Sequence, residues 1–192
     1  LAYVPEAAFE TDVAPLLAEM REISSGPMAE FTAQLTASYV LRGLLPADEL
    51  DSILLGEEIP LEVKAKAIEI IWRWASGPEH VEQCLGFLIK VVAEGNNALV
   101  GRLDPVFRTL RPADLPRARQ FIAALLAHPA RGESEFWMLE YLEKALPIWP
   151  EEAFETLELV LAHAEKELED RPILTATRSE APLRIATFVL ET

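Results

Sequence analysis

The chain has 192 residues, of which 51% are hydrophobic and 26% are charged. This composition excludes a disordered chain, and the length suffices for a folded domain with a sizeable core. A single cysteine, Cys84, excludes an internal disulfide and a zinc site built from several cysteines. No apolar run approaches the roughly 20 residues of a membrane helix, so we expect no membrane contact and a cytoplasmic location.

Charge is unevenly distributed along this acidic chain, whose net charge is −15. Residues 1–95 hold 6 Lys and Arg against 16 Asp and Glu, and residues 132–192 hold 5 against 14. Residues 96–131 reverse the trend, with 6 against 2. We expect these arginines to pair with acidic helices nearby, and a phosphate-facing or partner-facing surface is the alternative. The candidate binding residues are therefore Arg102, Arg108, Arg111, Arg117, Arg119 and Arg131.

Apolar residues recur with helical spacing along the whole chain, and no stretch alternates with the period of a strand for long. Several helices are expected to start at a proline followed by acidic residues, because proline lacks an N–H that the first turn leaves unpaired. Pro15 and Pro105 are each expected to break a helix. The sequence predicts nine to eleven helices, over 4–23, 28–45, 46–55, 60–76, 79–95, 98–110 (broken), 112–128, 135–146, 150–170 and 179–191.

Two helix details follow from residue type. The helix over 28–45 is expected to bury Phe31, and the helix over 79–95 is expected to stop at Gly95 in a left-handed conformation. Trp149 lies on the connection between two helices and is therefore the one of the four tryptophans expected to be exposed, which makes it a candidate binding residue.

Four of the predicted helix starts align as a repeat. Counting from Pro60, Pro78, Pro112 and Pro150, the starts are separated by 18, 34 and 38 residues, and apolar residues share one helix face. Intervals of this size are typical of a helical hairpin in an α-solenoid. The alternative is that any four amphipathic helices align in this way. The aligned residues are Val63, Val81, Leu115 and Ala153 at the third position, Ile70, Leu88, Ile122 and Val160 at the tenth, and Trp74, Val92, Leu126 and Ala164 at the fourteenth.

Residues that carry known chemistry are scarce. The sequence has no glycine-rich phosphate loop, no nucleophile elbow and no His-Glu-x-x-His motif. His80 and Cys84 stand four residues apart on one predicted helix, but no further ligands occur at a recognisable spacing. We therefore expect no metal, no cofactor and no catalytic residue.

The segments "RPADLPRARQFIAALLAHP" (111–129), "FWMLEYLEKALPIWPEEAFETLELVLAHA" (136–164) and "SEAPLRIATFVLE" (179–191) resemble HEAT-type helical repeats. More loosely, they look like the helical C-terminal arrays of large bacterial ATP-binding proteins. The resemblance implies an irregular α-solenoid that binds other proteins. A weaker resemblance, to HEAT-like DNA alkylation-repair glycosylases, implies DNA held in a basic groove, but no catalytic residue of that family can be matched to this chain.

The expected architecture is a single all-α helical-repeat domain over 1–192, less regular over 1–58 and repeat-like over 59–192. Because the chain starts at Leu1 rather than Met, a complete domain and a fragment of a larger protein both stay open. We favour a non-catalytic interaction scaffold or sensor module with a protein partner, and leave the oligomeric state open. The alternatives are nucleic-acid binding through Arg102 to Arg131, and an enzyme whose site carries perturbed carboxylates.

Overall fold

A computed structural model describes residues 8–23, 25–130 and 134–170 of the chain. Over these residues it contains ten α-helices, one π-helical turn at Phe9–Val13, one 3₁₀ turn at Pro112–Asp114 and no strand, so the all-α prediction is confirmed. The predicted last helix lies outside the described residues. The α-helices are α2 (Ala14–Met20), α3 (Gly26–Leu41), α4 (Ala47–Leu55), α5 (Leu61–Trp74), α6 (Val81–Glu94), α7 (Asn97–Val100), α8 (Val106–Thr109), α9 (Leu115–Ala127), α10 (Ser134–Ala145) and α11 (Pro150–Asp170).

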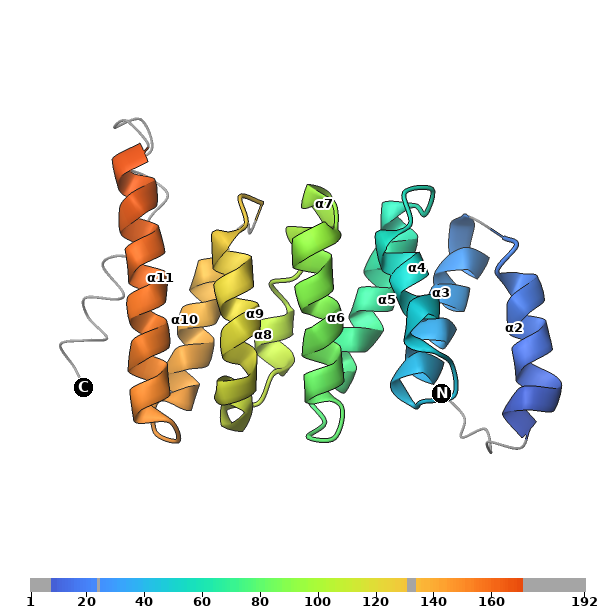
Figure 1. The fold of residues 1–192 in the computed structure, drawn as a ribbon, viewed down its shortest axis with the longest axis horizontal. Helices are drawn as coiled ribbons and strands as arrows, with labels where there is room; N and C mark the ends of the chain where they lie inside the picture. Colours follow the sequence, from blue (N-terminus) through green and yellow to red (C-terminus); the bar gives the residue numbers. More distant parts are fainter. Residues whose placement is uncertain (1–7, 24, 131–133, 171–192) are drawn as a thin grey trace.

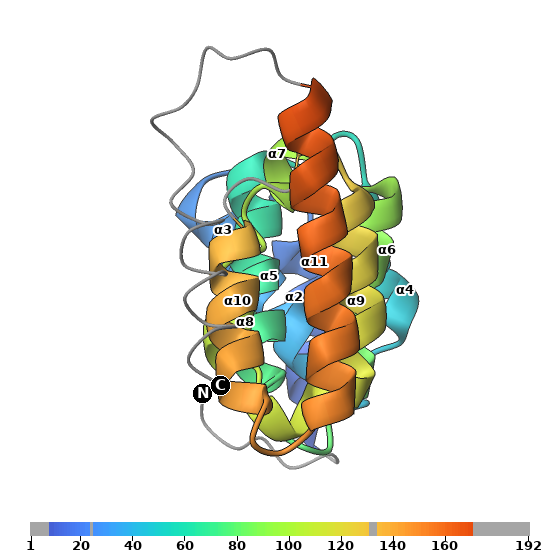
Figure 2. The same cartoon turned by 90° about the vertical axis from the view of Figure 1, so that its left-hand side faces the viewer.

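The helices lie side by side in two layers along the long axis of the molecule (Figures 1 and 2). One layer holds α4, α6, α9 and α11, and the other holds α3, α5, α8 and α10. Contacts run mainly between helices close in chain order, with the most extensive between α3 and α5 and the next between α6 and α9. The described helices are all too short or too polar to cross a lipid bilayer.

Prolines mark some of the predicted helix starts but not all of them, because α6 begins three residues after Pro78 and α9 begins after a 3₁₀ turn that contains Pro112. Helix α4 begins directly after Pro46, α5 directly after Pro60, and α11 at Pro150. Near Pro15 the backbone forms a π-helical turn and then α2, so the predicted interruption is confirmed. Proline has no N–H to donate back along the helix, and its ring crowds the carbonyl four residues earlier, which favours such an irregular turn.

Pro105 also interrupts its helix as predicted. The segment that the sequence places at 98–110 contains two helices of only four residues each, α7 and α8, joined by turns. In the chain, α7 and α8 lie between the long helices α6 and α9. In the second layer, α8 has 4 residues, whereas α5 and α10 on either side of it have 14 and 12.

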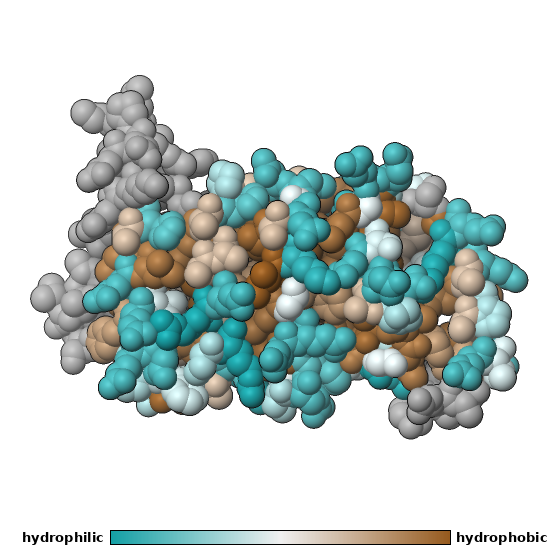
Figure 3. Space-filling view, in the orientation of Figure 1, coloured by the Kyte–Doolittle hydropathy of each residue, from teal (hydrophilic) through white to brown (hydrophobic). Residues whose placement is uncertain are grey.

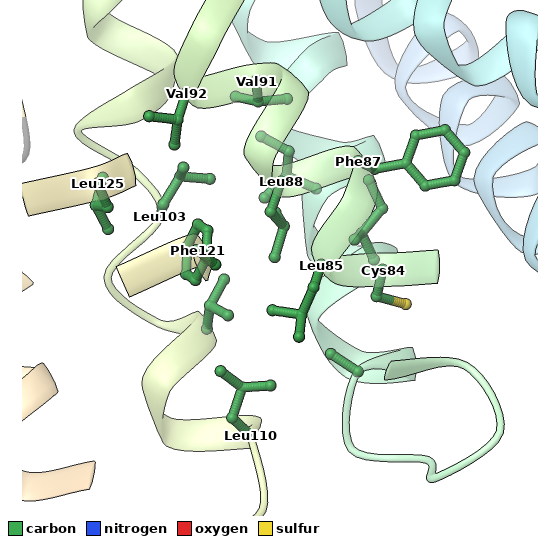
Figure 4. Close-up of a cluster of buried hydrophobic side chains, with 14 of the residues drawn as sticks. Cys84, Leu85, Phe87, Leu88, Val91, Val92, Leu103, Leu110, Phe121 and Leu125 are labelled. Atoms are coloured by element: carbon green, nitrogen blue, oxygen red, sulfur yellow. The ribbon is translucent and has the colours of Figure 1, made fainter. Parts of the chain in front are cut away.

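A continuous apolar core fills the space between the layers. Figure 4 shows its centre, where Leu85 and Leu88 of α6 lie near Phe121 and Leu125 of α9. All eight residues at the third and tenth aligned positions are buried, none more than 6% exposed. The predicted helix face is therefore correct at these two positions, whether or not the helices form a true repeat.

The prediction for the helix over 28–45 is wrong in one detail, because Phe31 is 47% exposed. Helix α3 instead buries small residues, including Ala29, Ala33 and Ala37. Small side chains let two helix backbones approach closely, which accounts for the extensive contact between α3 and α5. A large ring on this face would hold the two helices apart.

Glycines end two helices for different reasons. Gly43 has a φ of 72°, and its N–H and that of Leu44 donate to the carbonyls of Val40 and Tyr39, which closes α3 with a left-handed turn. Gly95, predicted to be left-handed, has a φ of −74° instead. Glycine is needed there because a Cβ atom would lie 2.2 Å from the Val91 carbonyl oxygen.

Candidate functional site

Two of the candidate arginines are held by a buried carboxylate. Asp114, only 1% exposed, accepts hydrogen bonds from Nε and Nη2 of Arg111 at 2.7 and 2.9 Å, and from Nη1 of Arg117 at 3.0 Å. The hydrogen bond with Asp114 raises the pKa of Arg111. Both arginines lie three residues from Asp114 in sequence. These charge-assisted hydrogen bonds hold both side chains at the start of α9.

Two aromatic residues donate hydrogen bonds to carbonyls of the same turn. The hydroxyl of Tyr141 donates to the Arg111 carbonyl at 3.1 Å, and the indole N–H of Trp149 donates to the Ala113 carbonyl at 3.1 Å. Burial raises the pKa of Tyr141, so this hydroxyl keeps its proton for donation. Trp149 is half-buried and packed against the core, not exposed as predicted, because a ring next to a turn can bind its free carbonyl.

Arg119 forms an ion pair between two helices of one layer. Its Nη2 lies 2.6 Å from Oε2 of Glu155, so the pair links α9 to α11. The two side chains are 41% and 60% exposed, and a pair this exposed contributes little to stability. Among the described arginines of the basic segment, Arg119 thus pairs with an acidic helix nearby, as expected, whereas Arg111 and Arg117 pair with Asp114 inside the segment itself.

The two remaining described arginines, Arg102 and Arg108, have no ion pair within the part of the chain that the structure describes. Arg108 stacks on an aromatic ring instead, with its Cζ 3.6 Å from the centroid of Trp137. Arg102 is exposed beside it in the turn between α7 and α8. Arg131 lies outside the described residues. The structure therefore singles out two of the six candidate arginines.

Both free arginines line one groove, with a volume of about 380 Å³. Its lining residues come from α5, from the turn before α8, from α8 and from α10. The groove, named here the α5–α10 groove, lies at the short helix α8 of the second layer. Its lining comprises Ala65, Ile68, Glu69, Trp72, Gly101, Arg102, Asp104, Pro105, Arg108 and Trp137.

The two carboxylates of the α5–α10 groove already have partners. Glu69 accepts from Nζ of Lys66 at 3.2 and 3.3 Å and from the side-chain amide of Gln34 at 3.4 Å. Asp104 accepts a short hydrogen bond from the hydroxyl of Ser134. Lys66 neutralises Glu69, whereas the Ser134 hydroxyl is neutral and leaves Asp104 charged. Arg102, Arg108 and Lys66 against Glu69 and Asp104 therefore leave one net positive charge at the groove. The groove is locally basic in a chain whose net charge is −15.

The groove is also lined by Trp72, whose indole N–H has no hydrogen-bond acceptor among the described residues. This indole nitrogen is buried. Nearly all buried donors in folded proteins have a partner, and one without a partner lowers stability. The rings of Trp72 and Trp137 both pack partly against the core. The groove forms beside the broken helix at Pro105, and this predicted break is the feature of the sequence that points to the region.

The residues considered as half a metal site do not combine into one. The ring of His80 packs edge-on against Trp74, with centroids 4.6 Å apart. Cys84 is fully buried, and burial raises the pKa of its thiol to about 12. Over residues 8–23, 25–130 and 134–170, no three His, Cys, Asp or Glu side chains group closely enough to hold a metal ion.

The opposite layer presents a different surface. Across the face that carries α4, α6, α9 and α11, hydrophilic and hydrophobic side chains alternate and do not gather in one large patch (Figure 3). The charged residues on it include the paired Arg119 and Glu155. Comparison of the chain with protein-family models, with curated proteins and with solved structures gives no match.

Proposed function

We propose that this chain is a non-catalytic module that binds a partner protein, built as an irregular α-solenoid of the HEAT type. The observation that carries the proposal is the layered arrangement, in which helices contact mainly others one to three places away in chain order, as α3 contacts α5 and α6 contacts α9. Proteins built in this way present long surfaces assembled from successive helices, and they use those surfaces to bind partners.

The ion pairs that the arginines form favour a protein partner over a nucleic acid. Arg111, Arg117 and Arg119 are engaged by Asp114 and Glu155, so few positive charges remain for phosphates. A protein with a net charge of −15 repels nucleic acid at long range. A protein partner needs no such excess of positive charge.

The test is reconstitution with purified components. Proteins cross-linked to the full chain in a cell extract are identified, expressed and mixed with it, and the complex is measured by analytical ultracentrifugation and thermal unfolding. A partner present at about 100 times its dissociation constant raises the unfolding midpoint by roughly 5–10 °C. If none of the purified candidates forms a complex of fixed stoichiometry, the proposal is wrong.

A further inference from the structure

We infer that the α5–α10 groove binds an acidic peptide segment of the partner, with one carboxylate on Arg102 and Arg108 and one apolar side chain between them and Trp72. This inference rests on the proposed function, because it names the part of the partner that the module holds. It assigns a ligand class to a groove that neither repeat geometry nor sequence spacing marks as a site.

The charge of the groove selects an anionic group. Arg102 and Arg108 have no carboxylate partner within the described residues, while Glu69 and Asp104 are held by Lys66 and Ser134. An incoming carboxylate therefore meets two unpaired guanidinium groups. Charge-assisted hydrogen bonds of this kind are among the stronger polar contacts in proteins.

Stacking on Trp137 prepares Arg108 for this role. With its Cζ 3.6 Å from the ring centroid, the guanidinium lies over the indole and its side chain is held in place. An arginine held by its face keeps its N–H edge available for a carboxylate, and little side-chain entropy is lost when the ligand binds. A lysine could not stack and donate in this way.

The apolar lining of the groove favours a ligand that carries an apolar side chain as well as an acidic group. Ala65, Ile68 and Pro105 line it beside the two indole rings, and its volume is about 380 Å³. A free phosphate or carboxylate ion would leave these walls uncovered and would gain nothing from them. A peptide that carries a Leu or Phe next to an acidic residue covers both the charged and the apolar parts.

A nucleic acid fits the same groove less well. Proteins that bind duplex DNA commonly neutralise about 6–10 phosphates, whereas only two unpaired arginines stand here. The remainder of a long polyanion would face a surface with a net negative charge. A short acidic segment makes its contacts at the groove and then leaves the surface.

Fluorescence anisotropy with labelled peptides tests the inference. The probe is a short peptide in which Glu and Asp flank one Leu-Phe pair. One control peptide replaces Leu-Phe by Ala-Ala, and the other replaces the acids by Gln and Asn. We expect saturable binding of the probe below about 1 mM and at least about tenfold weaker binding of either control, because each lacks one of the two contacts.

Two charge reversals locate the site. Arg102→Glu with Arg108→Glu, and Arg117→Glu with Arg119→Glu, each change the net charge from −15 to −19, since two positive charges become two negative ones. We expect the first pair to weaken probe binding at least about tenfold and the second, whose arginines lie on α9, to change it less than about twofold. If the first pair unfolds the chain, Arg102→Glu alone serves, because Arg102 has no ion pair within the described residues to lose.

Four results would overturn the inference. The first is no binding of the probe, and the second is equal loss of binding in both reversals. The third is competition by duplex DNA for the same arginines. In the fourth, a reconstituted partner binds the Arg102/Arg108 reversal as tightly as the unmodified chain, which leaves the proposed function standing and removes only the groove. Failure to find any partner, by contrast, removes the proposed function itself.

Discussion

Replacing Leu126 by alanine tests the shared core face of the aligned helices. Leu126 lies on α9 at the fourteenth aligned position and is 0% exposed. The change removes three carbon atoms, worth about 2.4 kcal/mol at about 0.8 kcal/mol each, and the cavity left behind adds roughly 1 kcal/mol. We therefore expect the free energy of unfolding to fall by about 3 kcal/mol, and the midpoint temperature by roughly 6–12 °C.

Guanidinium unfolding followed by circular dichroism measures this loss. Val160→Ala removes two carbons at the tenth aligned position, where the residue is 1% exposed, and should lose about 1.5–3 kcal/mol. Leu16→Ala is the matched control, because Leu16 is 56% exposed and its loss should stay within about 0.5 kcal/mol. A change near zero at both Leu126 and Val160, or an equal loss at Leu16, would refute the aligned register.

Three further predictions follow from the structure. Reversing Arg117 and Arg119 to Glu should lower the free energy of unfolding by about 1–2 kcal/mol in denaturant titrations without weakening partner binding, since their ion pairs are partly exposed; weaker binding in calorimetry would contradict this. Burial raises the pKa of the Cys84 thiol from 9.0 to about 12, so stability should fall as pH rises above about 9; in Cys84→Ala the fall between about pH 9 and 10 should vanish, whereas the fall above 10 should persist because burial also raises the pKa of Tyr141 from 10.0. Gly95→Ala should destabilise the chain by about 1–3 kcal/mol in thermal melts, whereas Gly86→Ala, where a Cβ meets nothing within 4 Å, should stabilise it slightly; similar effects at both would be contrary to the geometry.

Much of the fold could be predicted because its signals are local. A proline can start a helix but cannot continue one, so Pro46, Pro60 and Pro150 mark starts and Pro105 marks a break. Helical spacing of apolar residues then identifies the buried face. These signals depend on residues within a few turns of one another, and the sequence carries that information directly.

What the sequence could not supply depends on close approach between elements. At Gly95, only glycine fits beside the Val91 carbonyl. A glycine in a sequence does not reveal whether the position requires a left-handed backbone or only the absence of a Cβ atom. The exposure of Phe31 follows from the close contact between α3 and α5, which small residues on the opposite face make possible. Such distances are known only once the helices are placed.

The candidate site also contains both contacts between residues close in sequence and contacts between distant helices. Arg111 and Arg117 each lie three residues from Asp114, a spacing that can be recognised in a sequence. The pair between Arg119 and Glu155 joins two helices far apart in the chain and cannot be recognised in this way. Sequence reasoning could therefore find the basic segment but could not tell which of its arginines stay unpaired.

The net charge of the chain and the charge of the groove act at different distances. At physiological ionic strength, charges more than about 8 Å apart in solvent are largely screened, so the net charge of −15 governs mainly the rate at which an acidic partner approaches. Once the partner is in contact, the nearest groups decide whether it stays. In the α5–α10 groove these are Arg102 and Arg108, because Lys66 and Ser134 already bind the nearby carboxylates. An acidic protein can therefore hold an acidic segment in the groove at its short helix α8.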